Sequence, residues 1–107
     1  MAFQAFEIAI EMIGCIREPL EQVRKHDADL ARQLRRAASS VPLNLNEGRR
    51  RVGKDRRHHY RVAAGSADEV VAGLRVAQAW GYLGDGAAAE ALARLDSVLA
   101  ICWKLTH

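Results

Sequence analysis

The chain has 107 residues, of which 50% are hydrophobic and 27% charged, with 8 glycines and only 2 prolines. This length predicts a single domain over residues 1–107, and the composition excludes a disordered tail, a collagen-like repeat and a disulfide scaffold. The scarcity of turn residues also disfavours an all-β sandwich. Sixteen basic residues against thirteen acidic ones give a mild formal net charge of +3.

The N-terminal segment predicts a protein without a secretion signal. Glu7 and Glu11 interrupt its apolar residues and no basic region precedes them, which is typical of an amphipathic helix. No run approaches the roughly 18 apolar residues of a membrane span. Cys15 and Cys102 form no CxxC motif. We therefore expect a cytoplasmic protein with two reduced thiols and no membrane partner.

The first predicted helix extends from Phe3 to Val23. Apolar residues recur along it at intervals of three and four, which is the spacing of one helix face. Pro19 is expected to end this helix, to bend it, or to start a short second piece as its first residue, because proline lacks the N–H of a helical hydrogen bond. The predicted face comprises Phe3, Phe6, Ile10, Ile13, Ile16, Leu20 and Val23.

The second predicted helix follows a capping signal. Asp27 or Asp29 can accept a hydrogen bond from the free N–H groups of the first turn. Pro42 lies inside the apolar stripe and is expected to kink the helix, and Gly48 and Gly53 bracket the turn at its end. The stripe comprises Leu30, Leu34, Ala37, Val41 and Leu45.

The third and fourth predicted helices share one turn signal. The third is expected to begin near Lys54 or Asp55 and to reach roughly Leu83. The sequence Gly-Asp-Gly at 84–86 is a turn in which Asp85 can cap the fourth helix. Their apolar lines are Tyr60, Ala63, Ala64, Ala67, Val70, Val71, Leu74 and Ala77, and then Leu92, Leu95, Val98, Leu99, Cys102 and Leu105.

Four amphipathic helices joined by short turns predict an all-α, up-down-up-down antiparallel four-helix bundle. In that topology the first and fourth helices are antiparallel, so Cys15 and Cys102 lie toward opposite ends. At a rise of about 1.5 Å per residue their separation is expected to be well over 10 Å. A disulfide within one chain is therefore not expected.

Ordered motifs occupy the second and third helices. Residues 30–48 match the pattern L-x-x-Q-[LI]-R-R-A-x-x-S-[IV]-P-x-N-[IL]-x-E-G, and residues 63–69 match A-x-G-S-x-x-E. Residues 77–83 follow A-x-x-L-G-Y-[LI], with Trp80 where an aliphatic residue is usual. These blocks lie within residues 30–83, about half of the chain, and together they resemble the proteins encoded in intervening sequences of 23S ribosomal RNA genes.

The resemblance implies a four-helix bundle that assembles as a homopentamer. The family is similar to the accessory proteins of diversity-generating retroelements, which bind nucleic acid and a reverse transcriptase, whereas the intervening-sequence proteins have no established biochemical activity. This chain departs from the pattern at Asn46, which replaces a small apolar residue, and in its arginine-rich turn at 49–51. These departures bear on the partner rather than on the fold.

The polar motif residues predict a cluster between the second and third helices. Ser40 and Asn44 flank Pro42, and either side chain can bond the backbone that proline loosens. We favour a structural network that fixes helix register over a binding site. Gly65 is expected to let another helix approach closely, within the bundle or between protomers. The predicted cluster comprises Arg35, Arg36, Ser40, Asn44, Glu47, Ser66 and Glu69.

Charge is concentrated in one part of the sequence. Residues 24–61 net 12 − 4 = +8, and the rest nets 4 − 9 = −5. In a five-fold ring the turn at 49–61 would form a cationic rim that binds RNA or DNA through the phosphate backbone. Only Tyr60 lies among the arginines, so base stacking is expected to be weak. The expected nucleic-acid-binding residues are Arg49, Arg50, Arg51, Lys54, Arg56, Arg57 and Arg61.

A ribonuclease is the weakest functional hypothesis. Arg51 and His58 have the R-x(4–6)-H spacing of HEPN-type enzymes, in which His is the general base and Arg stabilises phosphate charge. However, Gly53 lies between them, and an arginine-rich segment produces this spacing easily. His58 and His59 are adjacent and point about 100° apart on a helix, so they cannot chelate one metal well. We expect no metal and no cofactor.

The sequence therefore favours a non-enzymatic, oligomeric binding module for nucleic acid or a nucleoprotein partner. The alternative is a structural assembly protein in which the basic turn is only solvated or pairs with acidic residues of a neighbouring protomer. Trp80, Tyr82 and Trp103 are the expected protomer contacts.

Overall fold

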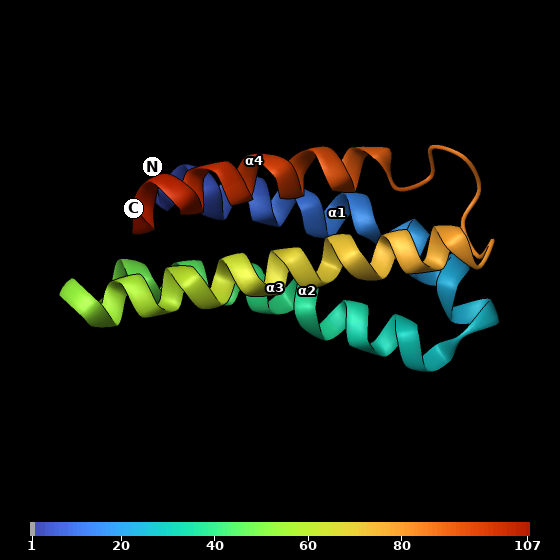
Figure 1. Cartoon of the computed structure of the whole chain (residues 1–107), viewed down its shortest axis with the longest axis horizontal. Coiled ribbons are helices and arrows are strands. Elements are labelled where there is room, and N and C mark those ends of the chain that lie inside the picture. Colours follow the sequence, from blue (N-terminus) through green and yellow to red (C-terminus); the bar gives the residue numbers. More distant parts are fainter. Residues whose placement is uncertain (1) are drawn as a thin grey trace.

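The computed structural model describes residues 2–107, which form four helices and no strand. The predicted all-α class is confirmed. Each helix contacts the next one along the chain, and α4 also contacts α1. Figure 1 shows α4 beside α1, α3 beside α2, and both termini at the same end of the molecule. The helices are α1 (Ala2–His26), α2 (Ala28–Arg49), α3 (Gly53–Ala79) and α4 (Ala89–Thr106).

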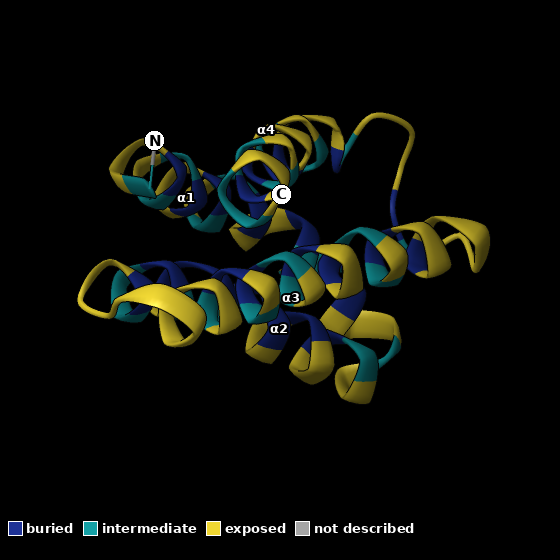
Figure 2. Ribbon diagram, turned by 60° about the vertical axis from the view of Figure 1, so that its left-hand side comes forward, coloured by how far each residue is buried: buried dark blue, intermediate teal, exposed yellow. Residues whose placement is uncertain are grey.

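The core is a continuous cluster of aliphatic and small side chains between the helices, seen as the buried inner faces in Figure 2. The inward stripes predicted for the second, third and fourth helices are confirmed in their main members. None of the helices in residues 2–107 has the length and apolar character needed to cross a membrane. The confirmed core residues include Leu34, Val41, Leu45, Val70, Leu74, Leu95 and Val98.

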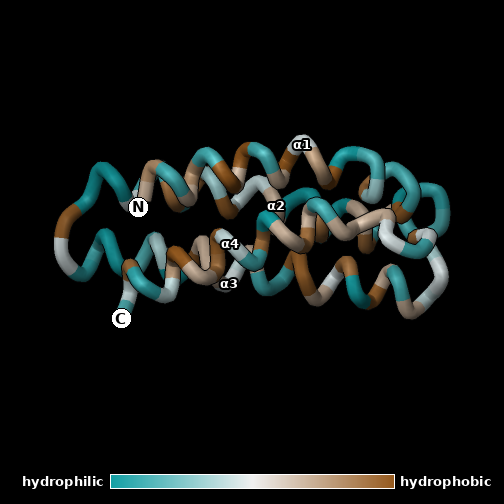
Figure 3. The backbone as a smooth tube through the Cα atoms, turned by 90° about the horizontal axis from the view of Figure 1, so that it is seen from above, coloured by the Kyte–Doolittle hydropathy of each residue, from teal (hydrophilic) through white to brown (hydrophobic). Residues whose placement is uncertain are grey.

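The predicted inward face of α1 is wrong in part. Phe3 is 61% and Ile10 46% exposed, whereas Ala5 and Ala9 are completely buried. Helix α1 carries apolar residues on both a buried and an exposed side, and Figure 3 shows brown, hydrophobic residues recurring along it. Small alanine side chains let α1 pack closely on its neighbours, so the bulkier residues lie outside. Ile16 is buried as predicted.

Both prolines lie inside continuous helices. Pro19 does not end α1, which extends to His26, and it does not start a second piece. Pro42 likewise lies within α2, and the kink predicted there stays a prediction. The Asn44 side chain donates to the Ser40 carbonyl at 2.9 Å, so one of the flanking side chains bonds the backbone around Pro42 as expected.

The link between α1 and α2 is one residue, Asp27. Its side chain accepts a hydrogen bond from the Leu30 N–H at 3.0 Å, and its backbone is extended. The sequence left Asp27 and Asp29 open as the N-cap, and the structure selects Asp27. A cap directly after α1 lets the chain reverse without a loop.

Helix α3 ends at Ala79, four residues before the predicted end at Leu83. Gly81 adopts the left-handed conformation with φ of 80°. The Tyr82 N–H then donates back to the Ala77 carbonyl at 2.9 Å, which closes a Schellman-type end. Glycine adopts this φ without the steric cost that a side chain brings, so the chain leaves the helix here.

The start of α3 agrees with the prediction, whereas the start of α4 differs from it. Helix α3 begins at Gly53, one residue before Lys54. Helix α4 begins only at Ala89, and its N-cap residue Ala88 makes no side-chain cap bond. The predicted capping role of Asp85 is therefore wrong, because that residue lies in the turn before Ala88.

The two thiols are free and lie far apart. Cys15 Sγ is 3.7 Å from Glu90 Oε2 in the first turn of α4, whereas Cys102 lies near the other end of α4. At about 1.5 Å per residue, Glu90 and Cys102 are separated by roughly 18 Å along the helix. This agrees with the predicted separation. Burial raises the pKa of the Cys102 thiol to about 11.

Candidate nucleic-acid interface and the adjoining polar cluster

Helices α2 and α3 form a closely packed antiparallel pair that positions the basic turn. A Cβ added at Gly48 would lie 2.5 Å from Tyr60 Cε1, and one added at Gly73 would overlap Leu34. Gly65 has nothing within 4 Å of such a Cβ, so its predicted role in close helix approach within the bundle is wrong. Close packing instead depends on the two glycines that face buried side chains.

The turn between α2 and α3 lies at the end of the molecule that also carries both termini (Figure 1). All of the predicted nucleic-acid-binding residues are exposed there, yet the structure divides them into two groups. One group is held by contacts within the chain, and the other makes no such contact with any of residues 2–107. The first group is Arg49, Arg51 and Arg56, and the second is Arg50, Lys54, Arg57 and Arg61.

Arg49 faces the N-terminal turns of α1. Its guanidinium carbon lies 5.3 Å from the Phe3 ring centroid and 5.7 Å from that of Phe6. Cation–π attraction at an exposed site contributes about 0.5–1 kcal/mol. Arg49 therefore connects the end of α2 to the start of α1, and its charge lies over aromatic rings instead of in open solvent.

Arg56 completes the C-terminal end of α2. Its guanidinium donates to the backbone carbonyls of Gly48 at 3.3 Å, Arg49 at 3.3 Å and Arg51 at 2.7 Å. The last carbonyls of a helix have no partner within it. A positive group placed on them also interacts favourably with the helix dipole. Arg56 thus stabilises the turn through hydrogen bonds to its backbone carbonyls.

Arg51 is neutralised by two carboxylates. It pairs with Glu47 at 2.7 Å and with Asp55 at 2.8 Å. The Arg51 hydrogen bond lowers the pKa of Glu47, and both carboxylates raise the pKa of Arg51. His58 points into solvent on α3 and makes no hydrogen bond within residues 2–107. The proposed ribonuclease pair thus has an arginine already occupied by carboxylates.

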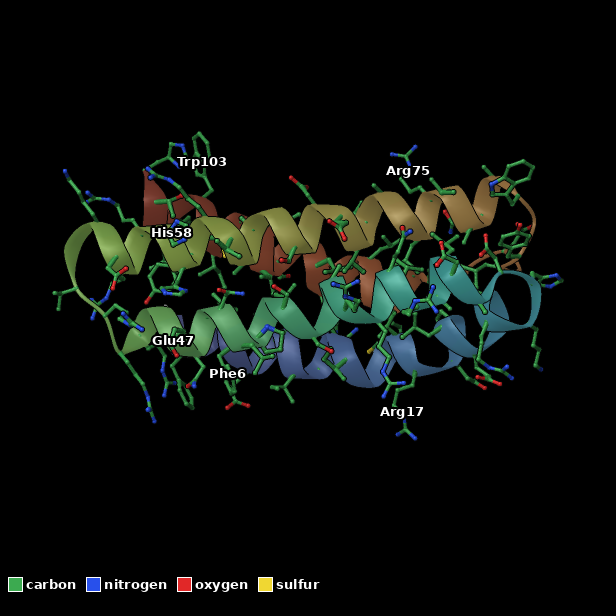
Figure 4. All side chains as sticks on the ribbon, turned by 90° about the horizontal axis from the view of Figure 1, so that it is seen from below. Phe6, Arg17, Glu47, His58, Arg75 and Trp103 are labelled. Atoms are coloured by element: carbon green, nitrogen blue, oxygen red, sulfur yellow. The ribbon has the colours of Figure 1, made fainter. Side chains whose placement is uncertain are left out.

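The remaining cations have no partner in residues 2–107. Arg50 is the C-cap residue that follows α2. Lys54, Arg57 and Arg61 lie at spacings of three and four along the first turns of α3. This spacing places these three on one helix face. Arg75 lies on the same helix toward the opposite end of the molecule (Figure 4). The unpaired positive charge of α3 is therefore concentrated at its N-terminal end.

A chain of hydrogen bonds joins α2 to α3 beside the turn. Ser66 Oγ donates to Ser40 Oγ at 2.8 Å, and Asn44 Nδ2 donates to the same oxygen at 3.0 Å. Asn44 Oδ1 lies 3.1 Å from His59 Nδ1. Because the Asn44 amide nitrogen donates to Ser40, its oxygen must accept, and His59 Nδ1 carries the proton. The structure thus brings together three predicted motif residues and adds His59.

His59 was missed because its role depends on pairing between helices. His59 and Ser66 are seven residues apart, which is one face of a helix, and Ser40 and Asn44 are four apart. In an antiparallel pair these two faces meet with Ser40 opposite Ser66 and Asn44 opposite His59. That pattern is present in the sequence, although it becomes informative only when the register is known.

The other motif residues lie outside this chain of hydrogen bonds. Glu47 belongs to the ion pair with Arg51. Arg36 and Glu69 are exposed and line a shallow surface pocket of about 500 Å³ next to Ser66. Arg35 lines a groove of about 620 Å³ between α1 and α2, and it also lines a shallow pocket with Arg36, Ser40 and Asn44. Six of the seven predicted cluster residues thus line two surface pockets that share Arg36 and Ser40, whereas Glu47 pairs with Arg51 outside them.

Two tryptophans are exposed at opposite ends of the molecule. Trp80, 70% exposed, follows α3, and Trp103, 61% exposed, lies near the end of α4. The Trp103 ring stacks on His107 with centroids 3.5 Å apart. Tyr82 is half-buried and lies between the rings of His26 and Trp80. Tyr60, the aromatic residue among the arginines, is only 3% exposed and cannot stack on a ligand.

Among residues 2–107 no group of three or more His, Cys, Asp and Glu side chains is placed to hold a metal ion. No curated protein matches the sequence significantly. The model of one family, described as 23S rRNA-intervening sequence protein, matches residues 2–104. That match spans all four helices and both sequence motifs. The chain therefore belongs to the 23S rRNA-intervening sequence protein family.

Proposed function

We propose that the protein is a non-enzymatic binding module that holds nucleic acid, RNA or DNA, at the α2–α3 turn. The observation that carries the proposal is the group of four exposed cations that have no partner among residues 2–107. Such cations bind backbone phosphates and release counterions, which supplies sequence-independent affinity. The contacts of Arg49, Arg51 and Arg56 give the turn its shape, so the four free residues present their charges from a fixed backbone.

We also propose that the helices form an up-down-up-down bundle and that five copies assemble into a ring. The order of helix contacts, in which α4 closes onto α1, supports this bundle. The exposed apolar side chains of Ile10 on α1 and Leu43 on α2 support a contact between copies that covers them. Charge is also self-complementary, since residues 24–61 net +8 and the rest nets −5. A head-to-tail contact between unlike surfaces can close into a ring.

One observation favours the structural alternative. Three arginines of the turn make contacts within the protein, namely Arg49, Arg51 and Arg56. A count of basic residues in the sequence therefore overstates the charge that is available to a ligand. A pure assembly protein would need the exposed apolar face of α1 but not the free cations. The binding hypothesis predicts that removing those cations weakens nucleic-acid binding, whereas the assembly hypothesis predicts no such effect.

The test compares two double charge reversals with the same change in net charge. Fluorescence anisotropy with a labelled RNA and a labelled duplex DNA measures binding at about 50 mM and 200 mM salt. We expect R50E·R57E to weaken binding more than tenfold. We expect K25E·R75E, which changes exposed cations away from the turn, to weaken it less than threefold. Absent binding by the unmodified protein, or equal losses in both variants, would refute the proposed interface.

A further inference from the structure

Trp103 lies at the same end of the molecule as the free cations of α3. Figure 4 shows Trp103 on α4 and His58 on α3 at this end, and the two helices contact each other. Trp103 is 61% exposed although it is one of the largest apolar side chains in the chain. Exposing a tryptophan loses much of the stabilisation that burial would give. Core packing therefore does not account for its position.

This tryptophan and the cations lie on sides of α4 and α3 that face away from α1 and α2. His59 and Ser66 of α3 contact α2, and at about 100° per residue Arg57 and Arg61 lie roughly 140–180° around α3 from them. On α4, Glu90 contacts α1 through Cys15, and Trp103 lies about 140° around the helix from Glu90. Trp103 and the two arginines are thus at the same end of two helices that contact each other.

The indole ring is also held in a defined orientation. His107 stacks on it with centroids 3.5 Å apart and an interplanar angle of 20°. The exposed fraction of Trp103 leaves the rest of the ring accessible to a ligand. A fixed aromatic surface beside unpaired cations is the combination used to bind single strands, because bases stack on the ring and phosphates pair with the cations. In a duplex the bases are already stacked on each other.

We propose that Trp103 is a base-stacking residue and that the ligand of the turn is single-stranded nucleic acid. One unpaired base stacks on Trp103, and phosphates on either side of it bind Arg57 and Arg61. This inference rests on the proposed function and specifies its ligand. It also replaces the sequence-based expectation of weak stacking, which considered only Tyr60, because α4 supplies an aromatic residue more than forty positions further along the chain.

The first experiment compares a single strand with a duplex of the same sequence. Anisotropy with a labelled 12-nucleotide RNA and its duplex is measured for W103L, which keeps an apolar side chain but loses the aromatic face. The matched control is W80L, which changes the other exposed tryptophan at the opposite end. We expect W103L to weaken single-strand binding roughly tenfold. The affinity of W103L for the duplex should change less than twofold. The affinity of W80L for either ligand should also change less than twofold.

Tryptophan fluorescence gives a direct second readout. The chain contains two tryptophans, so a W80F variant leaves Trp103 as the single reporter. We expect the single strand to quench this emission as a base stacks on the ring, and the duplex to leave it nearly unchanged. This measurement needs no change at Trp103 and is independent of the folding of W103L.

The outcomes separate the two proposals. If R50E·R57E loses binding while W103L keeps its single-strand affinity and W80F shows no quenching, the base-stacking role is overturned and the phosphate interface stands. If W103L weakens single strand and duplex equally, the selectivity for single strands is overturned. If the unmodified protein binds neither ligand, the proposed function fails, and this inference fails with it.

Discussion

Gly48 and Gly65 both lie within helices, but a methyl group added at each meets different surroundings. At Gly48 it would lie 2.5 Å from the buried Tyr60 ring, and at Gly65 it meets open space. We expect G48A to lower the free energy of unfolding by roughly 1–3 kcal/mol, since an aromatic ring in a packed core cannot move aside cheaply. We expect G65A to raise it by up to about 1 kcal/mol, because alanine is the better helix former.

Urea denaturation followed by circular dichroism, at one fixed protein concentration, measures both changes. The two variants are matched because each adds one methyl group within a helix. An unfolding free energy for G48A equal to that of G65A would mean that Tyr60 yields without cost, and the close approach of α2 and α3 would then not limit the side chain at position 48.

At the scale of single residues, sequence spacing predicts partners only when they are local. The carboxylates that neutralise Arg51 stand four residues before it and four after it, so this pairing could be predicted from spacing. The aromatic partners of Arg49 come from α1, more than forty positions away, and no local pattern indicates them. Counting arginines therefore gave the correct location of the basic surface but not which side chains are free.

At the scale of elements, a polar cluster joins α3 to α2. It consists of the hydrogen-bonded residues Ser40, Asn44, His59 and Ser66. Asn44 makes three hydrogen bonds, to the Ser40 carbonyl, the Ser40 hydroxyl and His59. Replacing it with alanine leaves partly buried polar groups without their partners, which costs about 1–3 kcal/mol. We expect N44A to lower the free energy of unfolding by this amount. Asn46 lies in the same helix and makes no side-chain hydrogen bond within residues 2–107, so N46A is the matched control.

Thermal and urea denaturation of N44A and N46A test this assignment. N46A should stay within about 0.5 kcal/mol of the unmodified protein, as expected for a helix substitution away from packed features. Equal stability of both variants would show that the cluster does not hold the helix pair together, and that apolar packing alone sets the α2–α3 register.

The spacing of apolar residues predicts the buried face of a helix well when the helix has only one apolar side. Helices α2, α3 and α4 each have a single stripe, and their inward faces agree with it. Helix α1 has apolar residues on two sides, so spacing alone selected the bulky series over the alanines that are buried. The end of α3 depends on a left-handed Gly81, a conformational choice that the apolar pattern does not encode. Side-chain size and backbone conformation decide these cases.

At the scale of the whole molecule, exposed apolar side chains and an uneven charge distribution both bear on how copies of the chain assemble. Ile10 and Leu43 are 46% and 67% exposed, and each lies on a helix of the α1–α2 pair. Burying both between copies would remove apolar surface from water, and unlike charges would set the orientation of the contact. The sequence suggested Trp80, Tyr82 and Trp103 as protomer contacts, and the exposed Ile10 and Leu43 offer a competing location.

Light scattering distinguishes these locations. We expect the unmodified protein to have about five times the 11.8 kDa mass of one chain. The double variant I10E·L43E should be monomeric, because carboxylates would have to be desolvated in the contact. Both side chains are exposed, so the fold of each protomer is spared. The control variant V76E·W80E changes another exposed apolar pair and should stay assembled. If V76E·W80E were monomeric and I10E·L43E assembled, the contact would lie at the end of α3.

In the proposed ring, assembly and nucleic-acid binding would be coupled through the number of cations that one ligand can reach. One protomer offers four free cations at the turn, so its binding should fall with salt at a logarithmic slope no steeper than about −4. A ring places several turns along one strand and gives a steeper slope, with higher affinity through effective concentration. We therefore expect I10E·L43E to bind more than tenfold more weakly and to show the shallow slope. An unchanged slope in this monomer would mean that a single turn accounts for all the binding and that the ring serves another purpose.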